Sequence, residues 1–118
     1  MSFLQLLASI YLTFAPGQLY AGPPAVLYSI AQCESGQRHT VKGELVVSHT
    51  DDVGYFQINR QHTQTAERLG YDIETEEGNI AFAVYLYQKN GTRDWNASKH
   101  CWGKPAIPAA VEAAEERA

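Results

Sequence analysis

Two carboxylates are the residues of this sequence whose types and spacing are best suited to chemistry. Glu34 falls near the end of an apolar segment, and Asp52 opens a short apolar run that is closed by the amides Gln57 and Asn59. The sequence between the two acids is rich in turn residues, so a helix end and a returning strand can bring them to opposite sides of one cleft. Two carboxylates in unlike surroundings, one protonated and one ionised, are what acid/base cleavage of a glycosidic bond requires.

A helix is expected to carry Glu34. Gly22-Pro23-Pro24 marks a break between two elements, and proline is favoured in a first helical turn. Residues 25–31 are almost all apolar, and Gly36 is placed to end the helix after Ser35. The dipole at a helix C-terminus disfavours negative charge, which together with apolar neighbours predicts a raised pKa for Glu34, as a general acid needs. The alternative, a solvated glutamate at a helix end, is countered only by the second acidic motif.

The segment after Asp52 is expected to present one polar face. Gln57 and Asn59 alternate with apolar residues, so this face can point at the cleft while the other packs inward. Gly54 permits close backbone approach or an unusual turn. For Asp51-Asp52 itself, a solvated turn is the alternative to a catalytic role.

The other elements predict an α+β fold that is mainly α. Residues 41–47 place β-branched residues around a glycine and indicate a small hairpin or strand pair. Asn59 is a suitable N-cap for a helix over roughly 60–69. Thr75, followed by two acids, opens a helix that ends at Asn90-Gly91 and is apolar nearly all round, as expected of a central core helix.

The two cysteines, Cys33 and Cys101, allow two interpretations. A disulfide would tie the end of the Glu34 helix to a last short helical turn, and closing so long a loop is worth about 4 kcal/mol in the entropic account. The alternative is a pair of reduced, buried thiols in a cytosolic protein. No paired Cys/His spacing indicates a metal site, and no cofactor is expected. The histidines are interpreted as surface or loop residues: His39, His49, His62 and His100.

A length of 118 residues predicts one globular domain over residues 22–103. Residues 1–21 are either a signal peptide, with a passable cleavage site near residues 19–21, or an N-terminal helix. Their uncharged stretch is too short to span a bilayer stably. Residues 104–118 are expected to form a linker and an Ala/Glu tail.

The charge balance restricts the partners. Nine Lys and Arg residues against thirteen Asp and Glu residues give a net charge of −4, with no basic run. Nucleic acid is therefore not expected as a partner, because phosphate binding depends on clustered cations. The same balance argues against a defence enzyme drawn to an anionic wall by its own charge. We expect a monomer.

Taken together, the two motifs resemble a known family. Glu34-Ser35 at a helix end, followed by D-V-G-Y-F-Q-I-N over residues 52–59, resembles the lysozyme superfamily, and the D-x-G-x-x-Q-I-N pattern is that of animal-type lysozymes. The later N-I-A-F-A-V-Y-L-Y helix, with Trp95 and Cys101-Trp102, is more similar to small bacterial lytic-transglycosylase-like domains. The resemblance covers about residues 24–102.

This resemblance implies an α-rich fold with a small β-hairpin lobe, a glycan cleft between the lobes, and peptidoglycan strands as substrate. The bond cut would be the β-1,4 bond between N-acetylmuramic acid and N-acetylglucosamine. By position, Glu34 matches the catalytic acid and Asp52 the nucleophile or ion-pair stabiliser. Gln57 and Asn59 match polar cleft positions for sugar hydroxyl and N-acetyl groups. The implied location is secreted or in the cell envelope.

Further residues follow the same resemblance less directly. Ser35 is expected to orient Glu34, and Tyr55 to lie with the substrate-binding residues. Tyr85 corresponds either to a cleft tyrosine of the transglycosylases or to a core tyrosine. Trp95 and Trp102 are sugar-stacking platforms or core residues, with at least one of them expected in the core.

The sequence also departs from both groups. Animal-type lysozymes carry more disulfides and a basic surface, whereas lytic transglycosylases work with a single glutamate and lack an acid at the position of Asp52. Asp52 therefore favours hydrolysis by Glu34 and Asp52 over formation of 1,6-anhydro ends by Glu34 alone. A non-catalytic glycan-binding module of the same fold is the rival from another class, and the presence of both acids argues against it.

Overall fold

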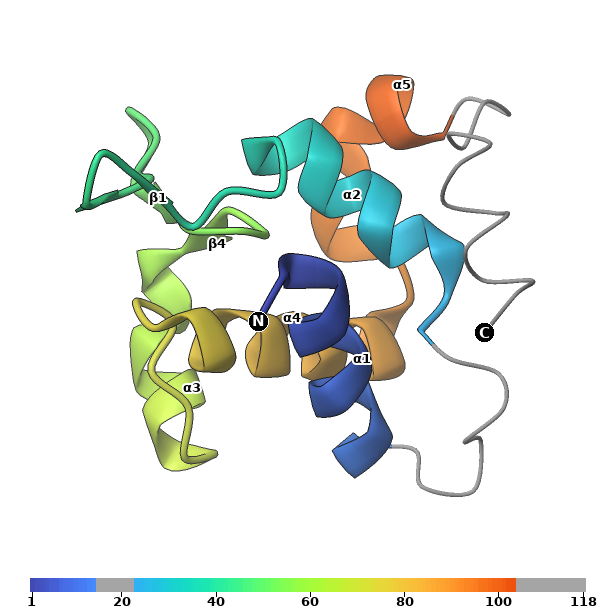
Figure 1. Cartoon of the computed structure of the whole chain (residues 1–118), viewed down its shortest axis with the longest axis horizontal. Helices are drawn as coiled ribbons and strands as arrows, with labels where there is room; N and C mark the ends of the chain where they lie inside the picture. The colour runs from blue at the N-terminus through green and yellow to red at the C-terminus, as the bar shows by residue number, and fades with distance from the viewer. Residues whose placement is uncertain (15–22, 104–118) are drawn as a thin grey trace.

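The chain forms a mainly helical α+β structure, as the sequence predicts. The computed structural model describes residues 1–14 and 23–103 (Figure 1). Its α-helices are α1 (Phe3–Phe14), α2 (Ala25–Ser35), α3 (Thr63–Arg68), α4 (Glu76–Asn90) and α5 (Lys99–Trp102), and its 3₁₀ helices are η2 (Arg60–His62) and η3 (Arg93–Ser98). The strands are β1 (Thr40–Val41), β2 (Glu44–Leu45), β3 (Asp52–Val53) and β4 (Ile58–Asn59). The expected tail 104–118 lies outside the described residues.

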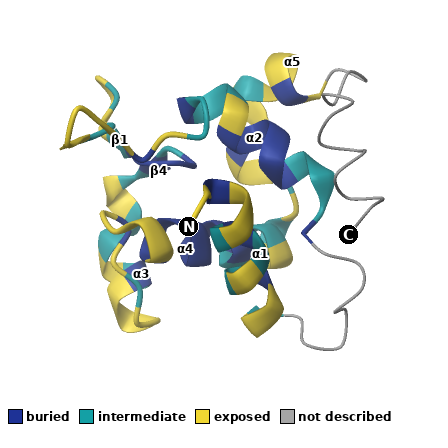
Figure 2. Ribbon diagram, in the orientation of Figure 1, coloured by how far each residue is buried: buried dark blue, intermediate teal, exposed yellow. Residues whose placement is uncertain are grey.

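Helix α4 is the centre of the hydrophobic core. Its N-cap is Thr75, whose hydroxyl accepts a hydrogen bond from the Gly78 amide at 2.9 Å, and two glutamates in its first turn suit the helix dipole. Figure 2 shows the buried residues of α4 between the surrounding elements, and they run almost without interruption from Gly78 to Leu86. A helix buried nearly all round is what its apolar composition predicts.

Helix α1 packs against this centre. Phe3, Leu7 and Tyr11 recur at four-residue spacing, are buried, and join the same core cluster as α4. The expected signal cleavage near residues 19–21 lies in the part of the chain that is not described. Within residues 1–14 and 23–103, no helix is long and apolar enough to cross a membrane.

Two small antiparallel hairpins form the β structure. Thr40 pairs with Leu45 in the first hairpin, and Asp52 pairs with Asn59 in the second. The single alternating segment expected after Asp52 is therefore folded back on itself, with a turn over residues 54–57. The alternation still holds locally, because Ile58 is buried while Asn59 is only half-buried.

Helix α2 ends where the sequence predicts and is bonded covalently to α5. Gly36 adopts the left-handed conformation (φ 67°) and its amide hydrogen-bonds to the Gln32 carbonyl at 2.9 Å. Cys33, in the last turn of α2, forms a disulfide with Cys101 in α5, with their Cα atoms 6.0 Å apart. This excludes the alternative of two reduced thiols, and it joins two segments 68 residues apart in sequence.

Candidate functional site

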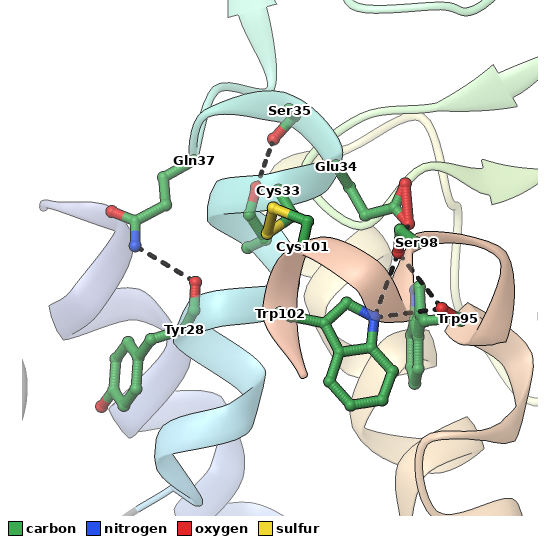
Figure 3. The surroundings of a disulfide bond; sticks show 10 residues. Tyr28, Cys33, Glu34, Ser35, Gln37, Trp95, Ser98, Cys101 and Trp102 are labelled. Carbon is green, nitrogen blue, oxygen red and sulfur yellow. Dashed lines mark hydrogen bonds between the residues drawn. A yellow bond between two sulfur atoms is a disulfide. The ribbon is translucent and has the colours of Figure 1, made fainter. Parts of the chain in front are cut away.

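Glu34 lies at the C-terminal end of α2 with its carboxylate turned towards η3 (Figure 3). Its Oε2 accepts a hydrogen bond from the Ser98 hydroxyl at 2.9 Å. Partial burial raises the pKa of the Glu34 carboxyl, the Ser98 hydrogen bond lowers it by less, and the charge of Asp52 raises it further. The net direction is upward from 4.5, which favours the protonated form of Glu34.

Asp52, at the start of β3, is surrounded by hydrogen-bond donors. Oδ2 accepts hydrogen bonds from the hydroxyls of Ser48, at 2.8 Å, and Thr50, and Oδ1 accepts from the Asn59 amide at 3.0 Å. Burial raises the pKa of Asp52, but the hydrogen bonds from Thr50, Asn59 and Ser48 outweigh it, so the pKa falls below its ordinary 3.8. Asp52 is therefore held as a carboxylate.

The neighbouring acid, Asp51, has a different environment. Its carboxylate is exposed and forms an ion pair with Arg60 at 2.6 Å. Its backbone is in the left-handed region (φ 68°), as in a tight turn. Asp51 fits the solvated turn that the sequence left open, whereas Asp52 does not.

A cavity of about 170 Å³ lies beside Asp52. Its lining combines carboxylates, amides and one indole: Asp52, Gln57, Ile58, Asn59, Gln61, His62, Leu86, Asp94 and Trp95. Four of the residues predicted from the sequence, Asp52, Gln57, Asn59 and Trp95, are therefore brought together. Glu34 does not line this cavity, but it is near enough to Asp52 for the charge of Asp52 to raise the Glu34 pKa.

Buried polar side chains from distant parts of the chain hold the turn that follows β3. Asn79 of α4 is fully buried, and its amide donates to the Val53 carbonyl and accepts from the Phe56 amide at 2.8 and 3.0 Å. The indole of Trp95 donates to the Phe56 carbonyl at 3.0 Å. Gly54 is required here, because its φ is 74° and a Cβ atom would lie 2.4 Å from the ring of His39. These contacts fix the geometry of the hairpin that carries Asp52.

Two of the predicted substrate residues, Ser35 and Tyr55, lie elsewhere. The Ser35 hydroxyl is buried and hydrogen-bonds the Tyr55 carbonyl at 2.8 Å, so it joins α2 to the hairpin, while Glu34 is bonded by Ser98. The Tyr55 ring packs on Phe3, with centroids 4.7 Å apart, and its hydroxyl donates to Glu76, so that burial and Glu76 raise its pKa to about 12. Neither residue lines the cavity beside Asp52.

The remaining aromatic residues divide between core and cavity. Tyr85 is half-buried and stacks on Phe82, with centroids 5.6 Å apart, as in the core interpretation of this tyrosine. Trp95 belongs to the core and also lines the cavity. Trp102 is buried, and its indole N–H donates to the Trp95 carbonyl at 3.0 Å.

Three of the residues that contact the two acids had no recognisable signal in the sequence. Ser98, Ser48 and Thr50 are hydroxyl residues in turn-rich or weakly helical sequence, where such residues are common. Only their distances from Glu34 and Asp52 in the folded chain reveal them. Asn79 carried a weak signal, as the polar residue directly before the apolar run of α4.

Comparisons with protein-family models, with curated proteins and with solved structures found no match to this chain. Among the residues that the structure describes, no three His, Cys, Asp or Glu side chains are grouped to hold a metal ion. The chemistry that the geometry supports is that of two interacting carboxylates whose pKa values are displaced in opposite directions.

Proposed function

We propose that this chain is a peptidoglycan-cleaving glycosidase, a muramidase of the lysozyme superfamily. The observation that carries the proposal is the opposite displacement of two neighbouring pKa values, upward for Glu34 and downward for Asp52. Such a pair supplies a proton donor and an anion at the same pH, which is the requirement of glycoside hydrolysis. The substrate assignment comes from the Glu-Ser and D-x-G-x-x-Q-I-N motifs and their resemblance to that superfamily.

In this mechanism Glu34 protonates the leaving glycosidic oxygen. Asp52 is the nucleophile or ion-pair stabiliser for the oxocarbenium-like transition state, and its three hydrogen-bond donors keep it ionised for that purpose. Glu34, now ionised, then acts as a base and takes a proton from the attacking water, which restores its acid form.

The cavity beside Asp52 is proposed as the place where one sugar of the strand binds. Gln57, Asn59 and the buried Trp95 line it, so amide groups and an aromatic residue are available at its wall. The Gln57 amide already donates to the Gly54 carbonyl at 3.0 Å, which leaves its oxygen available to a sugar hydroxyl. The disulfide fits action outside a reducing cytosol, so we propose a secreted or cell-envelope location.

Mass spectrometry of the fragments released from purified peptidoglycan tests this proposal. The wild type is expected to release fragments with reducing ends, and Glu34→Gln is expected to lower that release about 10²- to 10⁴-fold, the range for loss of a general acid. Glu67→Gln is the matched control, because Glu67 is exposed on α3.

The products separate the competing functions. Fragments with 1,6-anhydro ends would identify a lytic transglycosylase that uses Glu34 without Asp52, and would overturn the hydrolytic mechanism. No release by the wild type, with binding of glycan strands intact in both proteins, would identify a binding module and overturn the enzymatic proposal.

A further inference from the structure

A chain of hydrogen bonds leads from the core to Glu34 (Figure 3). The indole N–H of Trp102 donates to Ser98 Oγ at 3.1 Å and to the Trp95 carbonyl at 3.0 Å. Ser98 Oγ in turn lies 2.9 Å from Glu34 Oε2 and 3.1 Å from the Trp95 carbonyl. A serine hydroxyl has a single hydrogen to donate and two lone pairs with which to accept.

The direction of this chain follows from counting hydrogens. The Trp102 indole has a single N–H hydrogen, shared between Ser98 Oγ and the Trp95 carbonyl, so the Trp95 carbonyl already has a donor. Glu34 Oε2 has no donor other than Ser98 among the described residues, and hydrogen bonds to a carboxylate are the stronger ones. The Ser98 hydrogen is therefore directed at Glu34.

We propose that Ser98 is the positioning residue of Glu34 and that it assigns different roles to the two carboxyl oxygens. Oε2 accepts the Ser98 hydrogen, so the acidic proton resides on Oε1. That oxygen has no hydrogen bond within the described residues and is left for the leaving oxygen of the substrate. As the proton moves from Oε1 to the glycosidic oxygen, negative charge develops on the carboxylate and the Ser98 hydrogen bond strengthens. This inference rests on the proposed function of Glu34 as a general acid.

The disulfide makes this arrangement rigid. Cys33 directly precedes Glu34, and Cys101 lies in α5, immediately after the 3₁₀ helix η3 that ends at Ser98. The bond therefore joins the two backbone segments that carry donor and acceptor, although Glu34 and Ser98 are 64 residues apart in sequence. A positioning residue needs such support, because small displacements in an active site are costly to the rate.

The pH dependence has a definite sign. Asp52 is the titratable group whose charge acts on Glu34. Burial and the charge of Asp52 both raise the Glu34 pKa, whereas the Ser98 hydrogen bond lowers it. Ser98→Ala removes a bond that favours the ionised form, so the Glu34 pKa rises further. If Glu34 is the acid, the high-pH limb of the activity profile then moves to higher pH, while kcat falls about 10- to 100-fold, the usual range for a hydrogen bond to a charged group.

The experiment compares the wild type, Ser98→Ala, Ser98→Thr and the control Ser29→Ala. Ser29 is buried in α2, and its hydroxyl has no hydrogen-bond partner among the described residues, so its removal costs no such bond. Ser98→Ala should still fold, because the Trp102 N–H keeps its bond to the Trp95 carbonyl. The measurements are the Glu34 carboxyl titration by carbon-13 NMR and the pH profiles of kcat and KM on peptidoglycan fragments.

The expected result is a higher Glu34 pKa in Ser98→Ala, with kcat lowered and KM unchanged, and wild-type values in Ser98→Thr and Ser29→Ala. A Glu34 titration that is the same in Ser98→Ala and the wild type would overturn the proposal. The titration needs no turnover, so it tests Ser98 even if the wild type cleaves nothing. Conversely, an active wild type with an unchanged titration would leave the glycosidase standing and remove Ser98 from its mechanism.

Discussion

The surroundings of Glu34 and those of Asp52 differ in almost every respect. Glu34 sits at a helix C-terminus, partly buried, with a single hydroxyl for a partner. Asp52 sits on a two-residue strand, and donors from Ser48, Thr50 and Asn59 surround it. One region penalises negative charge and the other stabilises it, so that two similar carboxyl groups are fitted to opposite tasks.

The two regions also depend on different parts of the structure. The Glu34 region is held by the disulfide between α2 and α5. The Asp52 region is held by buried hydrogen bonds, above all those of Asn79 in α4. Changes that affect one region and spare the other therefore test whether the two are held in place independently, although the charge of Asp52 acts on Glu34.

The largest effect on stability is expected from loss of the disulfide. Cys33→Ser together with Cys101→Ser frees a loop with a sequence separation of 68, which lowers the free energy of unfolding by about 4 kcal/mol in urea denaturation. Because the side chains that donate to Asp52 all come from residues 48–59, outside both disulfide-bonded helices, the low pKa of Asp52 should be retained in the folded variant. A raised Asp52 pKa would show that the two regions are coupled.

Asn79→Ala is the corresponding change in the Asp52 region. It leaves the Phe56 amide and the carbonyls of Val53 and Ile73 without their partner, and lowers the free energy of unfolding by about 3 kcal/mol. Asn96→Ala, at an exposed position in η3, is the control and should change stability little. Equal losses in the two variants would contradict the structural role of Asn79.

The smallest effects on stability are expected from amide substitutions of the acids themselves, and they differ in sign. The Glu34 pKa in the folded chain lies above 4.5, so its contribution to stability is present below that pH and is lost as pH rises through the folded pKa. The Asp52 pKa lies below 3.8, so its contribution is present above that pH and is lost as pH falls through the folded pKa.

At pH 7, Glu34→Gln should therefore raise the free energy of unfolding. Asp52→Asn should lower it by about 1 kcal/mol, because hydrogen bonds to a charged acceptor are weakened. Urea denaturation at pH 7 and pH 3 measures the free energy of unfolding of each variant. The difference between each variant and the wild type should be smaller at pH 3. Two changes of the same sign at pH 7 would break the comparison between the regions.

Local sequence signals were enough to predict most of the helical framework. Gly36 ends α2, Thr75 caps α4, and Asn59 caps η2, each through contacts with residues close by in the sequence. The cysteine pair was predicted as one of two alternatives. These features depend on neighbours a few positions away, which a sequence displays directly.

The site was predicted less completely, because its details depend on distant residues. The turn over residues 54–57 exists because Asn79 and His39 hold it, and it carries the non-glycine residue Gln57 at φ 49°. This turn also directs Tyr55 into the core, where alternation along a single strand would not have placed it. The Ser98 contact spans 64 residues and has no local signature.

Carboxyl titration by carbon-13 NMR, in the wild type and in Asp52→Asn, tests the central claim most directly. We predict that Glu34 titrates above 4.5 and Asp52 below 3.8 in the wild type. In Asp52→Asn the Glu34 pKa should fall, because the repulsion from the Asp52 charge is gone. A Glu34 that titrates at or below Asp52, or that ignores the substitution, would contradict the division of labour between the two acids.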